Sequence, residues 1–224
     1  MLTELRDGVW WFECTGVNAY LVADGDGLTL VDTGTPFDAA TVEAAVESAG
    51  FDLSNVERIL ITHYDFDHVG SVAKLAVDAP VYIGRADAPL LTGEQRPPLS
   101  GAKPLLQLVT SPLIPEVSNE RVRRVDDGDE IGGFTAYHAP GHTPGHTVYV
   151  HEAREAAFLG DLVIEREGEL QPSPWFISYD TDDVHRSIEE VVARAPDIEV
   201  AAMGHGMPFR TGGGDRLRTL AESR

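Results

Sequence analysis

Four potential metal ligands lie within six positions of the chain, directly after the apolar run Ile59-Leu60-Ile61. They are His63, Asp65, Asp67 and His68. A buried strand is rigid, so a turn at its end can aim several side chains at one point. Imidazole and carboxylate groups supply the nitrogen and oxygen donors that zinc, iron and manganese accept. The motif therefore predicts a metal site at the end of a strand.

Three further ligand-type residues stand in contexts that are typical of turns. They are His142 in Ala-Pro-Gly-His-Thr-Pro-Gly-His, Asp161 in Phe-Leu-Gly-Asp, and His205 in Met-Gly-His-Gly. Seven donors exceed the needs of one tetrahedral ion. They suit two divalent metal ions that share a bridging carboxylate.

We expect three ligands for each ion and one residue that bridges both. One ion would take His63, Asp65 and His142, and the other Asp67, His68 and His205. Asp161 would be the bridge. Such a site leaves room for a shared hydroxide, which catalysis needs and a closed structural site lacks. Asp67 and Asp161 are also the candidate catalytic residues, because they would hold the metals and orient the nucleophile. The alternative is a structural site, but structural zinc usually recruits cysteines.

The other four histidines are not expected to bind metal directly. His138 and His151 alternate within predicted strands, which favours a role in packing. His146 follows Pro144-Gly145 and is a candidate for holding a turn or orienting a ligand. His185 falls on a predicted helix near acidic residues, where solvent exposure is expected.

The 224 residues fit one domain, so we treat 1–224 as a single unit. We see no targeting segment and no run long enough to cross a bilayer. The single Cys14 cannot form an internal disulfide, which is compatible with a reducing cytoplasm. The chain is therefore predicted to be cytoplasmic.

Acidic residues outnumber basic ones by 37 to 17, giving a net charge of −20. Only Lys74 and Lys103 are lysines. This charge repels phosphate backbones, so nucleic acid is not an expected partner; a small-molecule substrate is. A highly acidic chain with almost no lysine is typical of a halophilic cytoplasmic protein. The sequence carries no signal for oligomeric state.

The chain reads as two strand-rich halves with helices outside two sheets packed face to face. Strands are predicted at 9–14, 18–23, 28–32, 58–62, 81–84, 121–125, 134–138, 147–151, 156–159 and 199–203. A hairpin turn is expected at 24–27. Helices are predicted from Thr35 to Gly50, then at 69–77, 183–194 (capped by Thr181 or Asp182) and 215–222. Five prolines make 93–119 read as a long irregular connection.

Together the motifs resemble those of the metallo-β-lactamase superfamily, from about Asn18 to Pro208. The residues that carry the resemblance are His63-Tyr-Asp65-Phe-Asp67-His68, Pro140-Gly-His142-Thr-Pro-Gly-His146, Gly160-Asp161 and Gly204-His205-Gly206. The resemblance implies an α/β (α+β) fold, a four-layer αββα sandwich, with a dinuclear site at one edge of the paired sheets.

Asp65 stands where this family usually carries a second histidine. A carboxylate here adds negative charge beside the metals, which favours harder ions. Zinc is the ion that the family implies, and iron or manganese becomes an alternative. Flavodiiron proteins are similar, with a glutamate at the matching position.

The resemblance implies hydrolysis of an ester, thioester or lactone by a hydroxide that bridges the metals. The alternative is an iron-dependent oxidoreductase acting on sulfur or oxygen species, similar to a sulfur dioxygenase or a flavodiiron protein. A binding module that has lost catalysis ranks last, because the ligand set is complete. Substrate contacts are expected from 93–119 and from 168–179, which includes Trp175, Phe176 and Tyr179.

Overall fold

The structure is a computed structural model that describes residues 1–24, 27–99 and 101–223. Its larger sheet contains seven strands in chain order, antiparallel from β1 to β4 and parallel from β4 to β7. They are β1 (Leu2–Arg6), β2 (Val9–Glu13), β3 (Asn18–Asp24), β4 (Gly27–Val31), β5 (Val56–Ile61), β6 (Val81–Gly84) and β7 (Val122–Val125).

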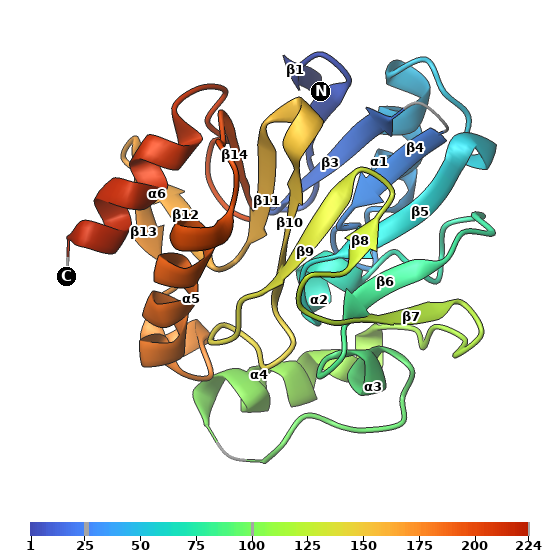
Figure 1. Ribbon diagram of the computed structural model, residues 1–224. Coiled ribbons are helices and arrows are strands. Elements are labelled where there is room, and N and C mark those ends of the chain that lie inside the picture. Colours follow the sequence, from blue (N-terminus) through green and yellow to red (C-terminus); the bar gives the residue numbers. More distant parts are fainter. Residues whose placement is uncertain (25–26, 100, 224) are drawn as a thin grey trace.

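The second sheet has the order β14-β11-β10-β9-β8 (Figure 1). Its strands are β8 (Glu130–Ile131), β9 (Phe134–His138), β10 (Thr147–His151), β11 (Ala156–Gly160) and β14 (Val200–Met203). Strands β11 and β14 are parallel, so their carboxyl ends lie side by side. A separate hairpin pairs β12 (Val163–Arg166) with β13 (Glu169–Pro172).

Six α-helices and four short 3₁₀ helices are described. The α-helices are α1 (Ala39–Ser48), α2 (Phe66–Val69), α3 (Ala88–Leu91), α4 (Ala102–Thr110), α5 (Thr181–Arg194) and α6 (Gly213–Glu222). The 3₁₀ helices are η1 (Leu53–Asn55), η2 (Ser111–Leu113), η3 (Glu152–Arg154) and η4 (Trp175–Ile177). None of the helices in this described part is long and apolar enough to cross a membrane.

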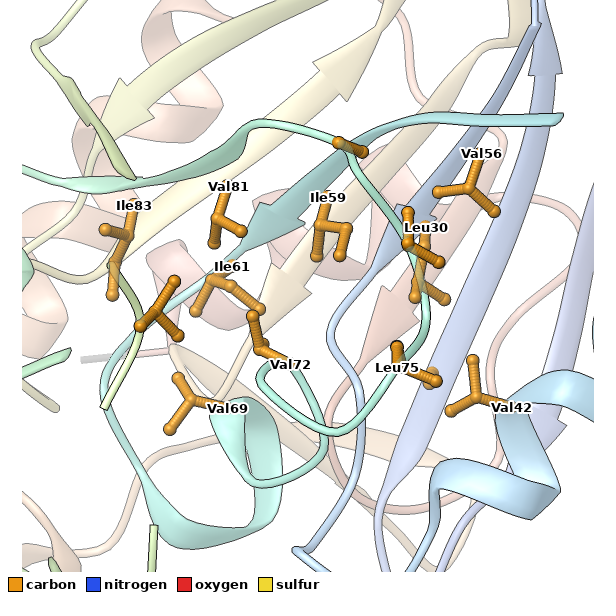
Figure 2. Packing of buried hydrophobic residues seen from close by; sticks show 14 of the residues in the cluster. Leu30, Val42, Val56, Ile59, Ile61, Val69, Val72, Leu75, Val81 and Ile83 are labelled. Carbon is orange, nitrogen blue, oxygen red and sulfur yellow. The ribbon is translucent and has the colours of Figure 1, made fainter. Parts of the chain in front are cut away.

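Three apolar clusters define four layers. On β5, Ile59 and Ile61 face the helix side of the larger sheet, whereas Leu60 faces the second sheet, as the two-residue period of a strand requires. Figure 2 shows Ile59 and Ile61 in one apolar cluster that also contains Val42 of α1 and Val69 of α2. A second cluster packs α5 and α6 against the other sheet, and the third lies between the sheets. The expected αββα sandwich is confirmed.

The prediction of an irregular connection over 93–119 was wrong. The segment contains α4 and η2, which run from Ala102 to Leu113. Pro104 is the third residue of α4, and Pro112 is in the first turn of η2. Proline is tolerated in the first turn because the N–H groups there have no helical partner. The five prolines therefore led to the prediction of a loop where the chain forms helix α4.

Three predicted helix starts also differ from the structure. Helix α1 begins at Ala39 with Asp38 at the N-cap, because the expected cap Thr35 donates its hydroxyl to the Asp38 carboxylate at 2.6 Å instead. The helix expected at 69–77 was wrong: α2 starts inside the ligand motif and ends at Val69, and residues 70–77 form no helix. The cap of α5 is Asp180, whose carboxylate accepts the N–H groups of residues 182 and 183.

The predicted strands at 81–84, 134–138 and 147–151 are confirmed as β6, β9 and β10. Strands β1, β8, β12 and β13 were not predicted, because they are short and lack a clear apolar alternation. Of the expected turn at 24–27, residues 25 and 26 lie outside the described residues, and β3 and β4 pair on either side of it.

Phe158 tests the layer between the sheets, where its ring lies 5.4 Å from that of Tyr20 and 5.8 Å from that of Phe134. We expect Phe158→Ala to lower the free energy of unfolding by about 3–5 kcal/mol, because truncation leaves a cavity. Chemical denaturation measures this. The exposed Phe176 is the matched control, and equal losses for the two variants would contradict the assignment.

Candidate metal centre

The seven predicted ligands lie together at one edge of the paired sheets. The motif from His63 to His68 follows β5, Asp161 follows β11, His205 follows β14, and His142 lies in the loop from β9 to β10. Potential ligand atoms form two groups, and within each group all lie within 4.8 Å of one another. The first group is His63, Asp65, His142 and Asp161; the second is Asp67, His68 and His205.

All members of the first group are buried. Asp65 Oδ2 lies 3.1 Å from His63 Nε2 and 3.0 Å from His142 Nε2. Asp65 also has an ion-pair partner that sequence reasoning missed, the ammonium of Lys103. This group therefore contains a cation supplied by the chain.

The second group is more open. His205 Nε2 lies 3.5 Å from Asp67 Oδ2, and the side chains of both residues are 32% exposed. His68 is fully buried behind them. None of the described lysine or arginine side chains forms an ion pair with this group.

Asp161 lies between the two groups. Its Oδ1 is 3.4 Å from His68 Nε2, whereas its Oδ2 is 3.2 Å from His205 Nε2 and 3.6 Å from His142 Nε2. The turn after β14 passes very close to this carboxylate. A Cβ atom on Gly204 would lie 2.1 Å from Asp161 Oδ1, so the close approach requires glycine.

The four histidines of the site all present Nε2 to the carboxylates. In each ring the opposite nitrogen, Nδ1, faces an oxygen of the protein. The oxygens are Thr62 Oγ1 for His63 (3.0 Å), Asp32 Oδ2 for His68 (2.8 Å), Ser173 Oγ for His142 (2.8 Å) and the Gly16 carbonyl for His205 (2.9 Å). A proton held on Nδ1 leaves the Nε2 lone pair available to a cation, which is the usual support of metal-binding histidines.

Asp32 holds the ligand motif from His63 to His68 in place through hydrogen bonds. Its carboxylate accepts hydrogen bonds from the N–H and hydroxyl of Thr62, at 2.9 and 2.8 Å, besides that from His68. The residue adopts φ 57°, in the left-handed region that aspartate tolerates better than most side chains. Sequence reasoning missed it as a site residue, although it stands at a strand end before the sequence Thr33-Gly34.

Asp87 joins two ligand loops. Its buried carboxylate accepts from the N–H of Tyr64 (2.9 Å), the hydroxyl of Thr143 (2.6 Å) and the N–H of Gly145 (2.8 Å). Burial raises the pKa of Asp87 above its usual value, against the effect of these bonds. The carboxylate thus ties the turn after β5 to the loop that carries His142.

The carboxylates raise the affinity of the site for positive charge. The Asp161 carboxylate raises the pKa of His205 to about 10. Burial alone would lower the pKa of His68, but the neighbouring Asp161 and Asp32 carboxylates raise it well above its usual value. Burial opposes ionisation of Asp161, but His68 and His205 hold the pKa of that carboxyl well below its usual range.

The donor set fits a metal ion best in the second group. His68 Nε2 and Asp161 Oδ1 are buried and have no hydrogen-bond partner among the described atoms, although they face each other at 3.4 Å. Unpartnered buried polar atoms are costly, and an ion between them would satisfy both. Imidazole nitrogen and carboxylate oxygen are the donors that zinc and iron accept.

The remaining histidines take varied positions. His138 is exposed and lies 3.0 Å from the Pro144 carbonyl, and His185 is half-buried on α5. His151 is buried, with its ring 4.8 Å from that of Phe134. His146 is buried with its ring 5.1 Å from that of His63, and burial keeps its pKa well below the usual value. None belongs to either group of potential ligands.

Comparison with known proteins agrees with this geometry. Residues 13–205 match the model of the metallo-beta-lactamase superfamily. A probable metallo-hydrolase of Bacillus subtilis, YflN, is 27% identical over 93% of this chain and 90% of its own length. An atrochrysone carboxyl ACP thioesterase of Cryptosporiopsis, dmxR1, is 28% identical over 68% of this chain and 40% of its own length.

Among solved structures, TTHA1623 in a di-iron-bound form has a TM-score of 0.67 and 28% identity, covering 95% of this chain and 96% of its own. With a family match over most of its length, the chain belongs to the metallo-beta-lactamase superfamily. Its fold and its cluster of potential ligands are those of a metallohydrolase class, and the predicted family is confirmed.

Asp32→Asn tests the support of His68 without changing the backbone requirement, because asparagine also tolerates positive φ. The amide can no longer accept all three hydrogen bonds. We expect metal affinity to fall about 10–100-fold, as for other partners of metal-binding histidines. Competition with a chromogenic chelator measures this, and unchanged affinity would show that Asp32 does not orient His68.

Proposed function

We propose that this protein is a metal-dependent hydrolase of an ester, thioester or lactone. The observation that carries the proposal is the second group together with the adjoining Asp161, because two buried atoms there, His68 Nε2 and Asp161 Oδ1, have no hydrogen-bond partner among the described atoms. A metal ion bound there would activate water and polarise a carbonyl group. Zinc is the ion we propose, with iron or manganese as alternatives.

The chain's own residues have separable roles in this proposal. Asp67 and Asp161 hold the cation and orient the nucleophile, because each carboxylate faces His205. The Gly16 carbonyl fixes the ring of His205, and Asp32 fixes that of His68. A rigid arrangement of this kind requires little reorganisation during reaction.

A cavity of about 430 Å³ opens beside these residues. Asp67, Asp161 and His205 line it together with the apolar Leu106 of α4 and Ile177 of η4. Trp175 and Phe176, which precede Ile177 in η4, are exposed large apolar side chains. We therefore propose that the substrate carries an apolar group, and that the segments 93–119 and 168–179 contact it. A relative named as a thioesterase supports an acyl substrate.

A redox function is the second candidate. The carboxylate of Asp65 adds an oxygen donor to the site, and a structural relative has been solved in a di-iron-bound form. Oxygen uptake with a persulfide substrate would distinguish an iron-dependent oxidoreductase from a hydrolase. The probable metallo-hydrolase of Bacillus subtilis, which matches 93% of this chain, favours hydrolysis.

Other features stay predictions of the sequence: one domain over 1–224, a small-molecule rather than nucleic-acid partner, and a cytoplasmic, halophilic setting for this acidic chain.

Cys14 is buried, and burial raises the pKa of its thiol to about 12, so the thiol is not a nucleophile at neutral pH.

Asp161→Ala removes the carboxylate that lies between the two groups. We expect this variant to lose bound metal and turnover together, falling to the rate of the uncatalysed reaction with p-nitrophenyl esters, acyl thioesters and lactones. Elemental analysis and a substrate panel measure the two losses. The exposed Asp78 supplies the matched control, Asp78→Ala. Full metal content with normal turnover in Asp161→Ala would rule out its role.

Leu106→Asp tests the apolar part of the substrate. We expect kcat/KM for a long-chain acyl ester to fall about tenfold or more relative to an acetyl ester, because a charge replaces an apolar wall of the cavity. Val109 is on the same helix but does not line the cavity, so Val109→Asp is the control. Equal effects on both esters would contradict an apolar acyl site.

A further inference from the structure

Helix α4 buries two long polar side chains and exposes most of its apolar ones. Lys103 is 3% exposed and Gln107 is 2% exposed, whereas Val109 is 68% exposed. Residues four apart share one face of a helix, so Lys103 and Gln107 point the same way. A helix that buries lysine and exposes valine is not positioned by the hydrophobic effect alone. Its buried polar face meets the metal centre.

Lys103 makes two contacts in the first group. Its Nζ forms an ion pair with Asp65 Oδ2 and lies 2.9 Å from His142 Nε2. An ammonium has no lone pair and can only donate, so His142 Nε2 must accept. The ring proton of His142 is then on Nδ1, where Ser173 Oγ accepts it at 2.8 Å.

The same lone pair cannot serve an ion as well. An imidazole Nε2 has one lone pair, and a zinc ion would need it at about 2.0–2.1 Å. Both oxygens of the Asp65 carboxylate also accept hydrogen bonds, Oδ1 from Gln107 Nε2 at 2.9 Å and Oδ2 from Lys103. An ion here would also lie next to an ammonium of like charge. The Lys103 ammonium therefore already supplies positive charge to Asp65 and His142 of the first group.

Gln107 holds this arrangement in place. Its amide donates to the Tyr64 carbonyl at 2.6 Å, and the hydroxyl of Tyr179 donates to its Oε1 at 2.7 Å. Tyr179 precedes α5, so the residue that fixes α4 is itself fixed from the second sheet's side of the site. Lys103 is the residue that a buried Asp65 requires, since a carboxylate buried without a cation is very costly.

The second group lacks such a partner. Its Asp67 and the adjoining Asp161 face only histidines among the described cationic side chains. Of the potential ligand residues, His68 and Asp161 are the ones with a buried atom that lacks a hydrogen-bond partner in the described part of the chain, namely Nε2 and Oδ1. The two groups thus differ in chemistry. In the first group, Lys103 neutralises the charge of Asp65. The second group has the donor atoms to bind a metal ion.

We propose that the site takes a single metal ion, held by Asp67, His68, His205 and Asp161, and that the Lys103 ammonium occupies the place of a second ion beside Asp65 and His142. This inference rests on the proposed function, because it assumes that the second group binds metal. It departs from the two ions that the motif predicts. It also makes Lys103 a fixed positive charge beside the cavity, which it lines.

The test is the number of metal ions per chain, measured by elemental analysis after equilibration with Zn²⁺ and, separately, with Mn²⁺. We expect one equivalent in the natural chain and two in Lys103→Met, where a neutral side chain of similar length frees His142 and Asp65. Lys74→Met is the matched control, since Lys74 is the other lysine and is exposed. It should bind one equivalent.

Two equivalents in the natural chain would overturn the inference while leaving the proposed function intact. One equivalent in both the natural chain and a folded Lys103→Met would overturn the role of the ammonium. No metal in either would overturn both proposals. Lys103→Ala provides a second variant, because alanine suits a helix well, and circular dichroism confirms that each variant is folded.

Discussion

Three carboxylates brought close together at the edge of the paired sheets are the constraint on which the rest of this site depends. Asp65 and Asp161 are buried and Asp67 is half-buried, so their negative charges cannot be left to water. Positive charge must come from histidines, from lysine or from a metal ion. The structure answers this requirement differently on the two sides of Asp161. On the side of Asp65, Lys103 supplies the positive charge. On the side of Asp67, imidazole and carboxylate donors remain, two of them with an unpartnered buried atom.

The fold makes this concentration of charge possible. Parallel strands deliver their carboxyl ends to one edge, so the residues that follow β5, β11 and β14 meet although the chain separates them widely. Apolar layers on both faces of each sheet hold those ends rigidly. Hydrogen bonds accepted by Asp32 and Asp87 then fix the turns, and those donated by the histidine Nδ1 atoms fix the rings. The stability of the sandwich therefore contributes directly to the precision of the site.

Much of this could be predicted from sequence, because the ligand motifs are local. His63 to His68 are adjacent, and each of the other ligands follows a recognisable strand or turn. Lys103 and Gln107 could not be placed in the same way. Their partners, Asp65 and His142, lie 38 and 39 residues from Lys103 in the chain, and only the packing of α4 brings them together. One signal was available, since Lys103 and Gln107 are polar residues four apart within an otherwise apolar run. The prolines around them made the segment read as a loop.

The departure at position 65 and the burial of Lys103 are best understood as one change. A histidine at position 65 would be neutral and would leave a buried lysine without a partner, whereas the observed aspartate pairs with it. Anomalous diffraction from crystals grown with Zn²⁺ tests this account most directly. We predict one anomalous peak, among Asp67, His68, His205 and Asp161, with Lys103 Nζ beside Asp65. Two peaks, with Lys103 turned away from His142, would contradict it.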